Sequence, residues 1–211
     1  MGHLTHSEKN GGSLFAADPE RAFDRQSIFW APEALSTVVS IRQVGAASDA
    51  GQYAIDWTRL AAGGDFRQGP DGWHAIVPLA GAIHRLHLAE IPARGSLVRA
   101  ELPFDANFDT RLLAADRFWS AMKGRRLGGA PLALPRHRRG RLIRRMRALD
   151  GWLAGNNYRE IAIGLFGKER VVGRPWKDND LRSLIIRLVK SAVALMRGGY
   201  RALLCPSSRK K

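Results

Sequence analysis

The spacing of apolar residues changes at Asp105, and this change constrains the fold more than any other feature of the chain. Between residues 27 and 104, short apolar runs are separated by turn residues. The strongest turn is Gly-Pro-Asp-Gly at 69–72, because Pro fixes φ and Gly accepts a positive φ. A second turn at 80–82 and a last run at 96–102 indicate four or five short strands in all. After Asp105, apolar residues recur at helical spacing.

The predicted fold class is therefore α+β: a small antiparallel β meander, or an open barrel, followed by a helical domain. We expect a polar tail over 1–25, an antiparallel β domain over 26–104, a connecting helix over 105–126 and a helical domain over 136–205. Two glycines and two prolines mark a linker at 127–135. The predicted apolar residues of the connecting helix are Leu112, Leu113, Phe118, Trp119 and Met122.

Positive charge is concentrated in the second part of the chain. Residues 123–211 contain 23 Lys and Arg against 5 Asp and Glu, a net charge of +18, whereas residues 1–122 have 11 basic and 14 acidic side chains, a net charge of −3. A fold does not require such a division, so it indicates a polyanionic partner. The single cysteine excludes an internal disulfide and favours a cytoplasmic protein. No apolar run approaches the roughly 20 residues that span a bilayer, so no membrane partner is expected.

Three helices are predicted in the basic region. The first, over 140–154, is rich in arginine, and its apolar face has Leu142, Met146, Leu149 and Leu153. The second starts at the capping box formed by Asn157 and Glu160 and runs to about Phe166. A loop over 168–177 precedes a long third helix that starts at 178–180, with Leu181, Leu184, Ile185, Leu188, Ala192 and Leu195 inward. This order predicts a tri-helical helix-turn-helix whose third helix enters the major groove, although the loop exceeds the usual three or four residues.

Basic and polar side chains of these helices are the candidate DNA contacts. Backbone contacts are expected from Arg138, Arg139, Arg141, Arg144 and Arg145, and from the Asn157 cap, which would present helix amides to a phosphate. Base contacts are expected from Arg182, Ser183, Arg187 and Lys190. Three alternatives remain open at this point. They are an RNA-binding module, a protein-only antagonist that sequesters a regulator, and a helical bundle whose basic face is merely solvated.

Neither a metal site nor a catalytic site is expected. His84 and His87 are three residues apart on a predicted strand, which places them on opposite faces. Asp178 and Asp180 are explained as the cap and dipole partner of the third helix better than as part of a nuclease. The sequence therefore predicts a protein that is not an enzyme and needs no cofactor.

The helical region also resembles a known family. Residues 147–204 contain RALDGWLAGNNYREIAIGLFGKERV, then WKDNDLRSLIIRLVKSAVALMRGGYRALL, which is similar to the RovC-like DNA-binding domain family. FWAPEA at 29–34 resembles the upstream part of that family, so the likeness extends over about 27–204. The matching positions are Tyr158, Arg159, Glu160, Ile161, Ala162, Leu181, Arg182, Ser183, Arg187, Gly199, Tyr200 and Arg201.

The resemblance implies a bacterial regulator of transcription. Its members include an activator of type VI secretion genes and regulators of excision in integrative elements, so activation is the expected role. Tyr158 and Arg159 join the expected backbone contacts on this ground. Many relatives have an additional small domain upstream, and only residues 1–25 precede the β segment here, so we expect that domain to be missing or supplied by another chain. The expected partners are duplex DNA, a second copy of the chain, and RNA polymerase or a co-regulator bound by the β domain, with the protein on the nucleoid.

Overall fold

The structure is a computed structural model that describes residues 14–18, 20–22, 25–45, 55–172 and 175–204. The chain divides into two compact units, Met1–Leu132 with Ala202–Lys211, and Ala133–Arg201. Each unit has its own hydrophobic core. A sheet followed by helices agrees with the α+β class. Most of the predicted polar tail falls outside the described residues.

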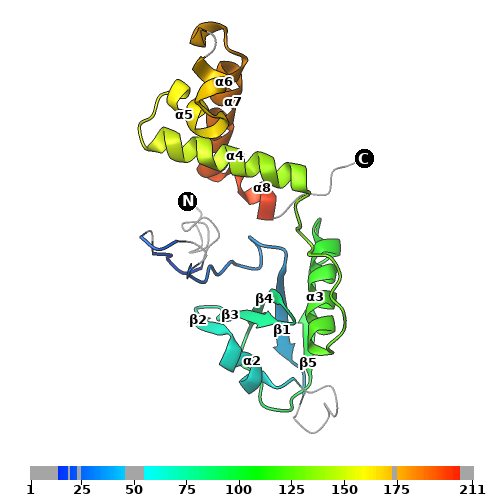
Figure 1. The fold of residues 1–211 in the computed structure, drawn as a ribbon. Coiled ribbons are helices and arrows are strands. Elements are labelled where there is room, and N and C mark those ends of the chain that lie inside the picture. The colour runs from blue at the N-terminus through cyan, green and yellow to red at the C-terminus, as the bar shows by residue number, and fades with distance from the viewer. Residues whose placement is uncertain (1–13, 19, 23–24, 46–54, 173–174, 205–211) are drawn as a thin grey trace. The chain divides into compact units, whose positions relative to one another are not determined.

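The first unit is built on a five-stranded sheet (Figure 1). Its strands are β1 (Val38–Gln43), β2 (Asp65–Gly69), β3 (Gly72–Leu79), β4 (Ala82–Leu88) and β5 (Val98–Glu101), in the order β2-β3-β4-β1-β5. The two tight turns lie where the sequence predicted them, and Gly72 and Gly81 have φ of 131° and 73°. A Cβ on Gly72 would come within 2.4 Å of the Leu88 carbonyl oxygen, so only glycine fits there.

The sheet is mixed, and the prediction of an antiparallel meander was wrong. β1 pairs with β4 in parallel, with Val39 beside Leu86, whereas its other neighbour β5 is antiparallel. Parallel neighbours cannot be joined by a tight turn and need a crossover. An unpredicted helix, α2 (Trp57–Gly63), lies in the connection from β1 to the edge strand β2. The hairpins β2-β3-β4 then return the chain to β1.

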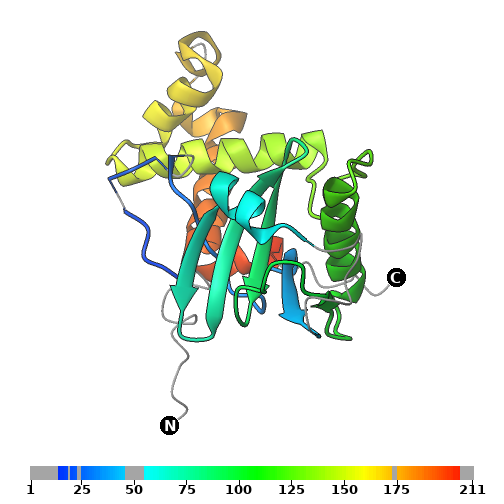
Figure 2. The same ribbon diagram turned by 90° about the horizontal axis from the view of Figure 1, so that it is seen from below.

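Helices α2 and α3 (Phe108–Met122) cover one face of the sheet (Figure 2). Trp57 of α2 and Phe118 of α3 belong to one core with Val39, Ile41, Ala75, Val77, Leu86 and Leu88. The predicted apolar face of α3 was wrong in part, since Leu112 and Leu113 are 48% and 55% exposed. The buried positions are Arg111, Ala114, Phe118 and Ala121, which recur at helical spacing. Two alanines let the helix approach the sheet closely, and the leucines therefore face outward.

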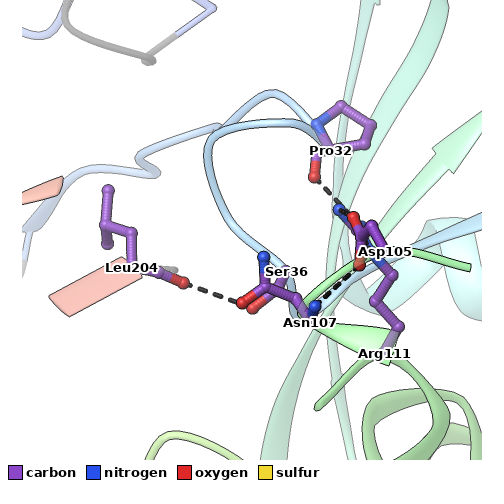
Figure 3. A network of polar contacts seen from close by, with 6 residues as sticks. All are labelled: Pro32, Ser36, Asp105, Asn107, Arg111 and Leu204. Atoms are coloured by element: carbon purple, nitrogen blue, oxygen red, sulfur yellow. Dashed lines mark hydrogen bonds and ion pairs between the residues drawn. The ribbon is translucent and has the colours of Figure 1, made fainter. Parts of the chain in front are cut away.

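Arg111 is a buried charged side chain in the described part of this unit (Figure 3). Its Nη2 donates to Asp105 Oδ2 at 2.9 Å, and its Nη1 donates to the Pro32 carbonyl at 3.2 Å. Asp105 also accepts from the backbone N–H of Asn107 at 2.8 Å. One arginine thus joins the start of α3 to the segment before β1. In the same unit, Ser36 is buried and its hydroxyl donates to the Leu204 carbonyl at 3.3 Å.

The second unit is helical. It contains α4 (Arg136–Leu153), α5 (Tyr158–Phe166), α6 (Lys168–Val172), a 3-10 turn (Trp176–Asp178) and α7 (Asp180–Ala194). A wide turn at Leu195–Gly199, with Gly198 at φ 114°, leads to α8 (Arg201–Leu204). Buried side chains from α4 to α7 form the core: Ala148, Ile161, Ala162, Val171, Leu181, Ile185 and Val189.

Three expectations for this unit were inexact. Helix α4 starts at Arg136, four residues earlier than predicted, because Pro135 sets the φ that precedes a first turn. Met146 and Leu153 of its predicted apolar face are 49% and 63% exposed, whereas Leu149 of that face is buried as predicted, together with Ala148. The predicted loop contains α6, whose Val171 enters the core. Because α6 interrupts the connection between α5 and α7, the tri-helical helix-turn-helix remains a prediction.

None of the helices in the described ranges combines the length and the apolar character that a membrane span requires.

Candidate nucleic-acid interface

Helix α4 is the main carrier of positive charge. Ala148 and Leu149 pack into the core, which directs most of the arginines outward. Arg138, Arg139, Arg141 and Arg144 are exposed, and Arg145 is half-buried. Arg144 donates from Nε to the Gly140 carbonyl one turn earlier, at 3.4 Å. The sequence thus folds into a helix that buries a narrow apolar stripe and exposes a broad cationic surface.

Helix α7 is oriented by a buried cap. Asn179 is 6% exposed; its Oδ1 accepts from the Leu181 N–H at 2.9 Å and its Nδ2 donates to the Arg170 carbonyl at 3.4 Å. The cap is therefore Asn179, not Asp178 or Asp180 as the sequence suggested. Asp180 lies in the first turn, where its negative charge interacts favourably with the positive end of the helix dipole. This cap also joins α7 to the end of α6.

A groove between α4 and α7 collects four of the candidate arginines. Arg141, Arg144 and Arg145 of α4 and Arg187 of α7 line a cavity of about 480 Å³. The rest of its lining is Phe166, Leu184, Leu188 and Ser191. The two helices pack closely, and Ala148 and Ile185 are both fully buried in their shared core. Four arginines therefore share one groove with three apolar side chains and a serine.

The groove is strongly cationic. No acidic side chain lines it, and within the described ranges none of its four arginines forms an ion pair with a carboxylate. Arginine remains charged at any physiological pH and offers donors that match phosphate oxygens in pairs. Low-dielectric walls strengthen the potential that such a cluster projects. The arrangement suits an anion with several oxygens, such as a nucleic-acid backbone.

The candidate base readers lie on the outer surface of α7. Arg182, Ser183, Arg187 and Lys190 are all exposed. Ser183, Arg187 and Lys190 follow one another at steps of four and three residues, so they share one side of the helix. Arg187 belongs both to this row and to the groove. The structure thereby joins one predicted base contact to three predicted backbone contacts.

The predicted contacts at the start of α5 lie away from the groove. Asn157 Oδ1 accepts from the N–H groups of Arg159 and Glu160 at 3.0 Å each, and the Asn157 N–H donates to Glu160 Oε2 at 2.8 Å. This confirms the capping box, and it also occupies two of the amides expected to bind phosphate. Phe166, which lines the groove, is at the other end of α5, about 12 Å along the helix axis. The roles of Asn157 and Arg159 in DNA contact stay predictions.

Tyr158 has a packing role in the structure. Its ring stacks on Trp152, with centroids 5.2 Å apart and an angle of 12° between the planes. It also packs against the helical core. Because the ring packs against Trp152 and the core, the predicted contact of Tyr158 with the DNA backbone would have to come from its phenol oxygen.

Sequence reasoning missed the floor of the groove. Leu184 and Leu188 were assigned to the core and Phe166 only to a helix end, yet all three also line this cavity. The half-burial of Arg145 was also missed. A helical pattern identifies which residues share a face of one helix. Whether the facing surfaces of α4 and α7 separate enough to leave a groove depends on the angle at which the two helices pack.

Comparison with known proteins bears directly on this surface. The model of a family described as "T6SS, Transcription factor, DNA binding domain" matches residues 101–205. No curated protein matches the chain. The matched segment includes α3 and all of α4 to α7, so the arginine groove lies within it. Residues 101–205 therefore belong to the RovC family of DNA-binding domains of type VI secretion system transcription factors.

Proposed function

We propose that this protein binds duplex DNA in a sequence-specific manner and regulates transcription, acting as an activator. The observation that carries the proposal is the convergence of Arg141, Arg144, Arg145 and Arg187 on one groove, inside a segment that matches a DNA-binding family. The net charge of +18 over residues 123–211 adds to it, because a long-range cationic field accelerates association with a polyanion.

The two helices have different tasks in this proposal. The arginines of α4 neutralise phosphates, which fixes the protein on the duplex without reading sequence. Helix α7 is 15 residues long, or about 22 Å, and exposes Arg182, Ser183, Arg187 and Lys190 to base edges in the major groove. Arg187 borders both surfaces, so it sets the register between phosphates and bases.

The first unit supplies the regulatory contact. Residues 1–122, which contain its sheet, have a net charge of only −3. We assign to this unit the binding of RNA polymerase, of a co-regulator or of a second copy of the chain. An activator needs such a second surface in addition to its DNA-binding surface. A location on the nucleoid follows from the proposal.

The test is the salt dependence of binding by the full chain and two matched variants. Arg144→Ala removes a groove arginine, whereas Arg147→Ala removes an exposed arginine of the same helix that does not line the groove. Each phosphate contact contributes about −0.9 to the slope of log affinity against log salt. Arg144→Ala should flatten the slope by about one unit, and Arg147→Ala should leave it unchanged.

Competition distinguishes the kinds of nucleic acid. A selected duplex should displace bound DNA at much lower concentration than single-stranded DNA, duplex RNA or scrambled duplex. Equal competition by RNA would support the RNA-binding alternative. Absence of binding to any duplex would overturn the proposal and favour the protein-only antagonist.

A further inference from the structure

A row of polar residues crosses the sheet of the first unit on the face opposite its core. His74 of β3 and His87 of β4 are directly opposite each other in the ladder. The row continues to Arg67 on β2, and to Ser40 on β1 and Glu101 on β5. The neighbouring row, with Ala75 and Leu86, faces α2 and α3. This alternation confirms that His84 and His87 lie on opposite faces, and it gives His87 a different partner.

Asp71 completes a cluster with the two histidines. It lies in the tight turn between β2 and β3, and its Oδ1 is 2.9 Å from His74 Nε2. Its Oδ2 is 3.5 Å from His87 Nε2, and its carbonyl oxygen is 3.2 Å from the same atom. One ligand atom from each of Asp71, His74 and His87 lies within 4.8 Å of the other two. Three groups that bind metals thus converge on one point.

We propose that Asp71, His74 and His87 form a binding site for a divalent transition-metal ion, of which Zn²⁺ is the best match. Imidazole nitrogen and carboxylate oxygen are ligands that Zn²⁺ takes at roughly 2.0–2.2 Å. Ligand atoms around a tetrahedral ion at that radius are roughly 3.4 Å apart. The separations of 2.9 and 3.5 Å from the two histidine nitrogens to the two oxygens of the Asp71 carboxylate are close to that value.

The surroundings favour a fixed site over a chance meeting of side chains. The side chain of His74 is 2% exposed and that of His87 is 19% exposed, so two of the three ligands are held by the sheet. Gly69 leaves the space beside them open, because a Cβ there would lie 3.1 Å from Asp71 Oδ1 and 3.3 Å from His74 Nε2. Arg67, the nearest cation in the row, is directed elsewhere. Its guanidinium pairs with Asp65 and lies 4.8 Å from the Phe29 ring centroid.

A cavity adjoins one of the three ligands. His87 also lines a cavity of about 450 Å³, with Ser40, Arg42, Glu101 and Arg111 among its walls. Three protein ligands with an open position are typical of sites that also bind water or a small anion. In this chain, the ion would tie the β2–β3 turn to β4 beside this cavity.

The experiment measures metal binding by the full chain after treatment with a chelator and dialysis. Titration with Zn²⁺ in competition with a chromogenic chelator gives affinity and stoichiometry. Co²⁺ in place of Zn²⁺ gives an absorption spectrum that reports the number and kind of ligands. We expect one Zn²⁺ per chain, a Co²⁺ spectrum typical of nitrogen and oxygen ligands, and a melting temperature that rises with Zn²⁺ concentration.

Variants assign the ligands. His87→Ala and Asp71→Asn should each lower the affinity at least tenfold, because loss of an outer-shell partner alone costs about 10–100-fold. The controls are His137→Ala, which changes an exposed histidine of α4, and the double variant His3→Ala with His6→Ala, which removes the two histidines that precede residue 14. Both controls should bind as the unaltered chain does.

Three outcomes would overturn the proposal. They are no metal bound by the unaltered chain, unchanged affinity in His87→Ala and Asp71→Asn, and loss of binding only in the His3 and His6 variant. If the unaltered chain binds no metal, the role of Asp71 is limited to its contacts with the two histidines. Because the Co²⁺ spectrum is recorded on the unaltered chain, a variant that folds poorly does not decide the result.

Discussion

Arg144 of α4 and Arg187 of α7 line the same groove, although they were predicted to have different roles, one on phosphates and the other on bases. If a single stretch of DNA backbone passes over the groove, the two arginines contact it together. Residues that share one partner are not energetically independent. The effects of Arg144→Ala and Arg187→Ala on binding should therefore be non-additive, by about 0.5–3 kcal/mol.

The measurement is a double-mutant cycle on the affinity for a selected duplex at fixed salt. A second cycle with Arg147→Ala and Arg187→Ala is the control, because Arg147 does not line the groove. Additive effects in the first cycle would show that the groove arginines act on separate parts of the DNA.

Arg182 is expected to affect specificity more than affinity. It is exposed on the first turn of α7 and does not line the groove. A bidentate arginine–guanine contact is worth about 1–3 kcal/mol of discrimination. Arg182→Ala should lose about that much on the preferred site and little on scrambled duplex. A similar loss on both sequences, measured by fluorescence anisotropy, would show that Arg182 contacts only the backbone.

Ile185 and Leu188 should differ in their contribution to stability. Ile185 is 0% exposed in the centre of the helical core, whereas Leu188 is half-buried and borders the groove. Truncation of a fully buried Ile or Leu costs about 2–5 kcal/mol. Ile185→Ala should fall in that range, and Leu188→Ala should cost less. Denaturant unfolding of both variants gives the comparison, and the reverse order would mean that Leu188 is the better packed of the two.

The Asn157 cap should be replaceable by another side chain that accepts hydrogen bonds. Asn157→Ala removes the acceptor of two backbone N–H groups and should destabilise the protein by about 0.5–2 kcal/mol. Asn157→Asp retains the acceptor and should remain near the stability of the unaltered chain. If both variants bind DNA with unchanged affinity after correction for folding, the side chain of Asn157 has no role in phosphate contact.

Asp105 is expected to make the stability of the first unit sensitive to acid. Hydrogen bonds from Arg111, then from the Asn107 N–H, lower the pKa of Asp105. A carboxyl whose pKa is lower in the folded state contributes stability above its unfolded pKa of about 3.9, and loses it as the pH falls through the folded value. Asp105→Asn should therefore melt below the unaltered chain at pH 7, and the gap should close below about pH 4.

Asp116→Asn on the exposed side of α3 is the control for that comparison. It removes an equal charge without touching Arg111. A gap that stays constant down to pH 3 would show that the stabilisation does not depend on the charge of Asp105.

Short-range signals in the sequence determined the local structure. Gly72 and Gly81 have the positive φ that their turns require, and Asn157 with Glu160 forms the predicted capping box. The concentration of arginine in 136–147 also predicted a cationic helix, which α4 is. These features depend on residues only a few positions apart, so they can be predicted from a single segment of the sequence.

Only the tertiary structure decided which distant segments meet. The parallel pairing of β1 with β4, the buried face of α3 and the placement of Arg187 beside the α4 arginines all depend on packing between elements. The same holds for His74 and His87, which become neighbours through the hairpin register and meet Asp71 through the adjacent turn. A periodic pattern indicates which side chains share a face of a helix or strand. Which other element packs against that face is decided by the free energy of burying the two surfaces together.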